Sequence, residues 1–286
     1  MPKKVQPPAE TLTAAEHYQR ALDAVNRGSN RKAITELTQA IKLNPTYTDA
    51  YNLRGLARRN EGKLHLAVAD FNMAIKQDAN SAITYSNRGF VHLELGDAAA
   101  AVDDYTQAIK LKTPLLESAY FHRGAAHFEL GEYAPAMQDF TKAIKLNPDY
   151  AEAYHARGDL HRLLLETDEA LEDYSKSVKI APEAPIAYIR RAEVLRAQGE
   201  YDAAIADYTR VISLEPAVPD LYVERGQLYD LKGSSMLAIQ DYLHYVEMGG
   251  SRTNKPVLWV SRRIFHLRLE RDLKPEKYRT RRWFDA

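Results

Sequence analysis

The sequence predicts an all-α fold, an α-solenoid built from seven tandem helical hairpins. Three observations support this prediction: similar residues recur every 34 positions, small and aromatic residues hold fixed places in each copy, and glycine or proline marks the expected helix ends. The copies occupy residues 14–47, 48–81, 82–116, 117–150, 151–184, 185–218 and 219–250, with one inserted residue near Thr113–Leu116. Positions are numbered from the first residue of each copy.

Small and large residues stand at matching positions of the two helices expected in each copy. Position 20 is always alanine, and positions 4 and 24 are aromatic in six copies, whereas the first copy has His17 and Leu37 there. Two antiparallel helices approach closely only where a small residue faces a bulky one. We therefore expect the rings to pack on position 8, which is small in every copy, as Ala21, Gly55, Gly89, Gly124, Gly158, Ala192 and Gly226.

The expected helix ends carry residues that interrupt a helix. Glycine near position 15 ends the first helix in six copies, because glycine adopts the left-handed conformation at little cost. Proline at position 32 stops the second helix in four copies. Leu165 replaces the glycine of the fifth copy and Ala79 the proline of the second. We expect a small local change of superhelical pitch at these departures and at the inserted residue.

This pattern resembles the tetratricopeptide repeat over residues 14 to about 250. The resemblance implies a right-handed superhelix in which the first helix of each hairpin lines a concave groove. Carried onto this sequence, the lining positions of the family predict a set of ligand-binding residues, namely Asn52, Leu56, Arg59, Ile83, Ser86, Phe90, Leu93, Phe121, Ala125, Phe128, His155, Asp159, Arg162, Ile189, Glu193 and Arg196.

The predicted lining is apolar and aromatic in the middle copies and mixed in charge further along. The lysines of the family's carboxylate clamp, which holds the end of a chaperone tail, are missing here. An extended or helical peptide with apolar side chains on Phe90, Phe121 and Phe128 suits the lining better. We therefore expect a protein-interaction adaptor or scaffold. In the alternative, some of these rings only pack against the next repeat.

Arginine occupies position 7 in all seven copies, and an acidic residue occupies position 23 in all seven. The parallel recurrence predicts that each arginine pairs with an acid on a neighbouring helix. The alternative is a basic stripe that binds phosphate or nucleic acid. The paired residues would be Arg20, Arg54, Arg88, Arg123, Arg157, Arg191 and Arg225 with Glu36, Asp70, Asp104, Asp139, Asp173, Asp207 and Asp241.

Histidines recur at position 11 of three successive copies, as His92, His127 and His161. Because residues one repeat apart lie on adjacent stacked helices, we do not expect them to converge on one metal ion. No acid, base and nucleophile set stands out, and the chain has neither a glycine-rich phosphate loop nor any cysteine. We expect no enzymatic activity, no metal and no cofactor.

The charge of the chain is split between its parts. Residues 1–250 hold 28 basic and 35 acidic residues, whereas residues 251–286 hold 11 and 4. We expect a flexible segment at 1–13, a capping helix at 251–272 and a basic aromatic tail at 273–286. The basic residues of this part are predicted to contact an anionic partner. Four roles stay open for them: binding nucleic acid, binding a protein partner, self-association, or an intramolecular clasp on the acidic repeats. These residues are Arg262, Arg263, Arg268, Lys277, Arg279, Arg281 and Arg282.

The start of the sequence lacks the apolar core of a secretory signal, and no stretch approaches the length and hydropathy of a membrane span. The absence of cysteine fits a reducing compartment. We expect a soluble, cytoplasmic protein without a membrane partner.

Overall fold

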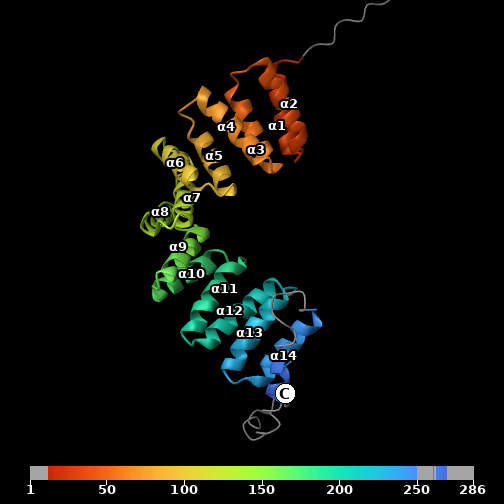
Figure 1. Cartoon of the computed structure of the whole chain (residues 1–286), viewed down its shortest axis with the longest axis vertical. Coiled ribbons are helices and arrows are strands. Elements are labelled where there is room, and N and C mark those ends of the chain that lie inside the picture. Colours follow the sequence, from red (N-terminus) through yellow and green to blue (C-terminus); the bar gives the residue numbers. More distant parts are fainter. Residues whose placement is uncertain (1–11, 250–259, 261, 269–286) are drawn as a thin grey trace, which may run out of the picture. The chain divides into compact units, whose positions relative to one another are not determined.

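The computed structural model describes residues 12–249, 260 and 262–268. These residues form the helices α1–α14, a further helical segment at 260 and 262–268, and no strand, so the predicted all-α fold is confirmed. Each odd-numbered helix packs against the next as an antiparallel hairpin (Figure 1). Residues 1–11 of the predicted flexible segment 1–13 lie outside the described part of the chain, and so does the whole predicted tail 273–286.

The helices group into two compact units, which meet in sequence after Pro148. Unit 1 contains α1 (Ala14–Asn26), α2 (Asn30–Leu43), α3 (Thr48–Asn60), α4 (Leu64–Gln77), α5 (Ala82–Glu94), α6 (Ala98–Lys110), α7 (Leu116–Glu129) and α8 (Tyr133–Leu146). Unit 2 contains α9 (Ala151–Leu163), α10 (Thr167–Ile180), α11 (Pro185–Ala197), α12 (Tyr201–Leu214), α13 (Pro219–Leu231) and α14 (Ser235–Glu247).

Within each unit, successive hairpins stack on one another. The second helix of one hairpin packs against the first helix of the next, as α2 does against α3 and α12 against α13. First helices also contact each other, since α3 touches α5, α5 touches α7, and α9 touches α11. Each unit is therefore a short α-solenoid whose first helices lie side by side.

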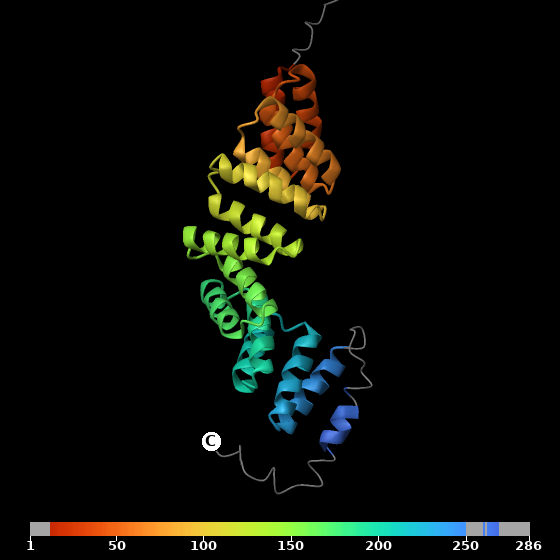
Figure 2. The ribbon, with the colours of Figure 1, turned by 60° about the vertical axis from the view of Figure 1, so that its left-hand side comes forward.

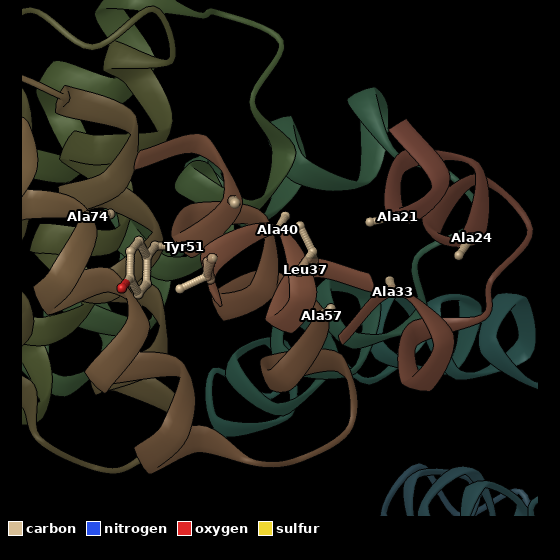
Figure 3. Close-up of a cluster of buried hydrophobic side chains, with 10 residues drawn as sticks. Ala21, Ala24, Ala33, Leu37, Ala40, Tyr51, Ala57 and Ala74 are labelled. Atoms are coloured by element: carbon tan, nitrogen blue, oxygen red, sulfur yellow. The ribbon is translucent and has the colours of Figure 1, made fainter. Parts of the chain in front are cut away.

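The core of each hairpin is the predicted contact of a ring with a small residue. A Cβ atom added to Gly124 would lie 2.9 Å from the Phe140 ring, and one added to Gly55 would lie 2.7 Å from the Phe71 ring. In the first hairpin, buried Ala21 and Leu37 belong to one cluster (Figure 3). The interlocking predicted from positions 8 and 24 is thus confirmed, and it sets how closely the two helices approach.

Six hairpin turns contain a glycine with φ between 71° and 81°. In the fifth hairpin, Leu165 adopts the same left-handed conformation, with φ of 63°. The insertion in the third copy is absorbed after α6, where Lys112 has φ of 57° and the Thr113 N–H donates to the Ala108 carbonyl. The substitution at position 15 therefore changes the side chain of the turn and leaves its backbone conformation in place.

The predicted pairing of arginines with acids is confirmed in six copies. In each, Nε and Nη2 of the arginine donate to the two carboxylate oxygens of the aspartate over 2.5–3.0 Å. The aspartate side chains are only 3–6% exposed. The basic-stripe alternative is wrong for these six, because their charge is neutralised by a fixed partner.

The first copy differs from this prediction. Here the Glu36 carboxylate pairs with His17, and His17 Nδ1 lies 2.7 Å from Glu36 Oε2. Within the described residues, Arg20 makes no ion pair with Glu36. The cause is position 4, which holds His17 here and a tyrosine in the other copies. A tyrosine ring lies beneath the arginine in those six copies, with Cζ 5.4–5.8 Å from the ring centroid.

Helical residues 262–268 confirm the described part of the predicted capping helix; the rest of 251–272 is not described apart from residue 260. Val260, Ile264 and Leu267 are buried and pack in one cluster with Tyr242 and Tyr245 of α14. In the ribbon, the short dark blue helix accordingly lies next to α14 (Figure 2). This helix therefore covers an apolar face that the last hairpin would otherwise leave in water.

Candidate functional site

The predicted groove residues of unit 1 lie on three adjacent first helices. They are Asn52, Leu56 and Arg59 on α3, Ile83, Ser86, Phe90 and Leu93 on α5, and Phe121, Ala125 and Phe128 on α7. A cavity of about 150 Å³ opens between these helices. It is lined by four predicted residues, Leu56, Arg59, Ser86 and Phe90, and by six that the prediction omitted, Asn87, Tyr105, Leu115, Ser118, Ala119 and His122.

Arg59 is held in place by two contacts within this groove. Its Cζ lies 4.1 Å from the centroid of the Phe90 ring, and its Nε and Nη2 donate to the Glu94 carboxylate over 2.8 and 3.0 Å. Both interactions use the charge of the guanidinium. Arg59 is therefore held against the Phe90 ring, and the two side chains together line one side of the cavity.

His122 sits among rings at the floor of the cavity. It meets Phe90 edge-on with centroids 5.1 Å apart and stacks on Tyr105 at 5.6 Å. Burial, and secondarily the positive charge of Arg59, lowers the pKa of His122 to about 4. At neutral pH the imidazole is uncharged, so it extends the aromatic lining.

Two amide side chains lie at this groove. Asn87 Nδ2 donates to Asn52 Oδ1 over 3.2 Å. The side-chain N–H groups of Asn52 can still donate hydrogen bonds, and the side-chain oxygen of Asn87 can still accept them. Such groups can hydrogen-bond the main chain of an extended segment.

The aromatic side chains that line unit 1 are each partly packed in a hairpin and partly exposed. Phe121 packs against Phe140 with centroids 6.0 Å apart, and Phe128 packs against Tyr133 at 5.9 Å, both within their own hairpin. Phe90, Phe121 and Phe128 are nevertheless only half-buried, and Ile83 is 53% exposed. The rings thus contribute to packing and still present apolar surface.

The predicted residues of unit 2 form a network of opposite charges. Asp159 accepts a hydrogen bond from the Tyr174 hydroxyl over 2.7 Å and lies 3.7 Å from Arg190 Nε. Arg190 also pairs with Glu193, and Arg196 pairs with Glu224 over 3.1 Å. Burial lowers the pKa of neighbouring His155, which keeps it uncharged at neutral pH. The lining on α9 and α11 is therefore polar, with its charges largely compensated within the unit.

A second cavity, of about 520 Å³, continues the lining of unit 2 onto its last helices. It is lined by Arg196, Gln227, Asp230, Leu231, Tyr242 and Arg263. Arg263 donates to both oxygens of Asp230, each over 2.6 Å. Gln227 and Asp230 stand at positions 9 and 12 of the seventh copy, which are lining positions of the family, so the repeat pattern could have predicted them as lining residues. Nothing periodic could indicate Arg263, which lies beyond the repeats.

Family models place the chain among known proteins. Models described as tetratricopeptide repeat match residues 18–82, 82–113, 118–150 and 136–185, and one described as TPR repeat matches residues 192–233. The chain belongs to the tetratricopeptide-repeat family. This fold is typically a non-enzymatic scaffold for protein interaction, and the repeats support a protein-interaction role for the chain in general. No curated protein matches the sequence.

Solved tetratricopeptide-repeat structures share the fold. A tetratricopeptide repeat protein from Parabacteroides merdae has 24% identity and a TM-score of 0.63, over 89% of this chain and 98% of that one. MamA has 26% identity and a TM-score of 0.53, over 57% and 94%. YrrB, described as a TPR protein with an unusual peptide-binding site, has 19% identity and a TM-score of 0.52, over 63% and 92%.

The histidines at position 11 of the tetratricopeptide repeats each face an acid in their own hairpin. Nδ1 of His127 lies 2.6 Å from Glu132 Oε2, and Nδ1 of His161 lies 2.6 Å from Glu166 Oε2. Nδ1 of His92 lies 3.6 Å from Asp97. In the described ranges, no three His, Asp or Glu side chains gather as a metal site.

The basic residues predicted to contact an anion near the end of the chain differ in their surroundings. Arg263 is engaged by Asp230, whereas Arg262 and Arg268 are exposed. Lys277, Arg279, Arg281 and Arg282 lie outside the described residues. Among the helices that the structure describes, none has both the length and the hydropathy needed to cross a bilayer.

Proposed function

We propose that this tetratricopeptide-repeat protein is an adaptor that binds a peptide or helical segment of a partner protein in the groove formed by α3, α5 and α7. The observation that carries the proposal is the cavity between these helices, whose wall is the fixed Arg59–Phe90 pair. Its volume of about 150 Å³ suits one apolar side chain of a bound segment. The peptide-binding site named for YrrB, a structure of similar fold, agrees with this use of the fold.

In this proposal, the partner places an apolar side chain between Leu56 and Phe90 and extends along Phe121 and Phe128. Asn52 and Asn87 hydrogen-bond its main chain. Because Arg59 and His122 bring no uncompensated charge to the cavity, the anchoring side chain is uncharged. In unit 2, the lining from His155 to Arg196 supplies polar contacts for a charged part of a partner.

The test is capture of partners from the native source by the full chain and by the variants Phe90→Asp and Phe128→Asp. A carboxylate in an apolar contact costs binding free energy because it loses its hydration. We expect one specific partner to be lost in both variants. Leu43→Asp is the matched control, since Leu43 is 55% exposed on the second helix α2. Capture that survives both groove substitutions would contradict the proposal.

The alternative of a nucleic-acid-associated subunit depends on the basic residues near the end of the chain. The pairing of Arg263 with Asp230 removes one of these residues from the set available to an anion. A steep loss of RNA or DNA affinity with added salt, traced to residues 262–282, would favour the alternative. No binding at low salt would remove it.

A further inference from the structure

The turn between α9 and α10 carries leucine where six other turns carry glycine. Leu165 has φ of 63°, and it is 85% exposed. A left-handed conformation brings the Cβ of leucine too close to the neighbouring carbonyl oxygen, a cost that glycine avoids. The chain therefore accepts both a strained backbone and exposed apolar surface at this turn.

Formation of the turn does not require the leucine. The Glu166 N–H donates to the His161 carbonyl over 2.9 Å, and in the glycine turn of the preceding hairpin the Glu132 N–H donates to the His127 carbonyl over 2.8 Å. The same hydrogen bond thus forms with either residue. The leucine side chain is therefore free of any role in forming the turn.

Leu165 belongs to a larger exposed surface. Leu163 and Leu164 are 48% and 43% exposed, so three consecutive leucines present apolar surface at one turn. We call Leu163, Leu164 and Leu165 the leucine patch. Contiguous exposed apolar residues of this kind mark interaction sites.

The leucine patch has an acidic border. Glu166, Asp168, Glu169 and Glu172 are exposed on α10 and just before it. Glu166 contacts His161, and Asp168 accepts from the Gln198 amide over 3.4 Å. The charge of Glu172 acts on Arg157, but that arginine already pairs with Asp173. Residues 149–249 hold 10 basic and 19 acidic residues, so this border belongs to an acidic unit.

We propose that the leucine patch and its acidic border bind the basic aromatic segment 273–286 of the same chain. That segment combines Lys277, Arg279, Arg281 and Arg282 with the rings of Tyr278, Trp283 and Phe284. Its rings match the leucines, and its cations match the net negative charge of the acidic border. At about 3.4 Å per residue, the 18 residues after Arg268 reach roughly 60 Å. This inference is independent of the groove on α3, α5 and α7.

Tryptophan fluorescence of the full chain tests the proposal. The only tryptophans are Trp259 and Trp283, so Trp259→Phe leaves Trp283 as the sole reporter. We expect acrylamide to quench Trp283 poorly in this parent chain. Adding Leu163→Ser and Leu165→Gly should raise the quenching constant at least two-fold. Leu165→Gly restores the residue that the other turns contain, so this change keeps the turn intact.

Controls separate the proposal from its competitors. Met236→Ser removes a 53% exposed apolar side chain elsewhere in unit 2 and should leave the quenching constant unchanged. Quenching of Trp283 in the parent as strong as that of free N-acetyltryptophanamide would overturn the proposal. Protection that appears only at raised protein concentration, together with a dimer in sedimentation, would assign the segment to a second copy and also overturn it.

A second measurement avoids the substitution at Trp259. Hydrogen exchange of residues 163–169 is compared between the unmodified chain and the chain with Arg281→Glu, Arg282→Glu and Trp283→Ser. We expect exchange at this turn to become several-fold faster in the variant, because the bound segment no longer covers it. Identical exchange in the two chains would overturn the proposal.

Discussion

The guanidinium of Arg123 donates from Nε and Nη2 to the two carboxylate oxygens of Asp139, each over 2.8 Å, and from Nη1 to the Thr106 hydroxyl over 3.2 Å. Arg123 therefore joins α7 to α8 of its own hairpin and to α6 of the preceding one. Four other copies repeat the third bond, to Thr38, Asn72, Ser175 and Thr209. The arginine ladder thus stabilises both the hairpins and their stacking.

Replacing Arg123 with methionine is expected to lower the free energy of unfolding by about 2–4 kcal/mol. The change leaves the Asp139 carboxylate, only 6% exposed, without its counter-charge. Urea unfolding measures the loss. As a control, Arg31→Met breaks the pair with Glu61, but the arginine is 88% exposed, so much less stability should be lost than with Arg123→Met. Unchanged stability with loss of partner binding would instead assign Arg123 to the ligand.

Two glycines of the fourth hairpin should respond differently to alanine. At Gly124 a Cβ would lie 2.9 Å from the Phe140 ring, and relieving this clash requires the helices to move, which should cost about 1–3 kcal/mol. At Gly131 the Cβ meets nothing within 4 Å, but φ is 75°, so the conformational cost should be about 1 kcal/mol. Phe140→Leu should partly rescue Gly124→Ala and leave Gly131→Ala unrescued. Equal rescue of both would contradict the packing account.

The fold should lose stability in acid through His122. Its pKa is lowered to about 4 in the folded state, so the unfolded state, with a pKa near the ordinary 6.5, takes up the proton first. Stability is fully present above pH 6.5 and falls as the pH drops from about 6.5 to 4, by about 1–3 kcal/mol for this group.

Urea unfolding at pH 7 and pH 4.5 tests this acid sensitivity. His122→Gln should reduce the difference in unfolding free energy between the two pH values. His65→Gln, at an exposed histidine of α4, is the control and should leave the difference as it is. If the two variants behave alike, His122 is not the group responsible.

The sequence could predict what the 34-residue period determines. Small residues opposite rings, turn glycines and the arginine–aspartate pairs all lie within one copy, where spacing alone brings residues together. It could not show Arg20 losing Glu36 to His17, since that outcome depends on competition between two side chains. Position 25 holds Thr, Asn or Ser in six copies, and this recurrence is a sequence signal for the third bond of each arginine.

The candidate site was harder to predict because it joins side chains from different copies. The positions lining the groove were assigned through the family resemblance, and they located Leu56 and Phe90 on the cavity. His122 and Asn87, at position 6, were omitted, because their direction depends on how α5 and α7 pack. The pairing of Arg59 with Glu94 also crosses between copies, so the spacing within one copy does not reveal it.

Site-specific photo-cross-linking from the groove tests the central claim most directly. A benzoyl-phenylalanine replaces Ala125 on α7 in the full chain, and in a control chain it replaces Leu66, 49% exposed on the second helix α4. In extract of the native source, we expect the Ala125 probe to label one discrete segment of a partner protein, and Phe90→Asp to abolish the labelling. Equal labelling from Leu66, or labelling from Ala125 that persists with Phe90→Asp, would contradict the account.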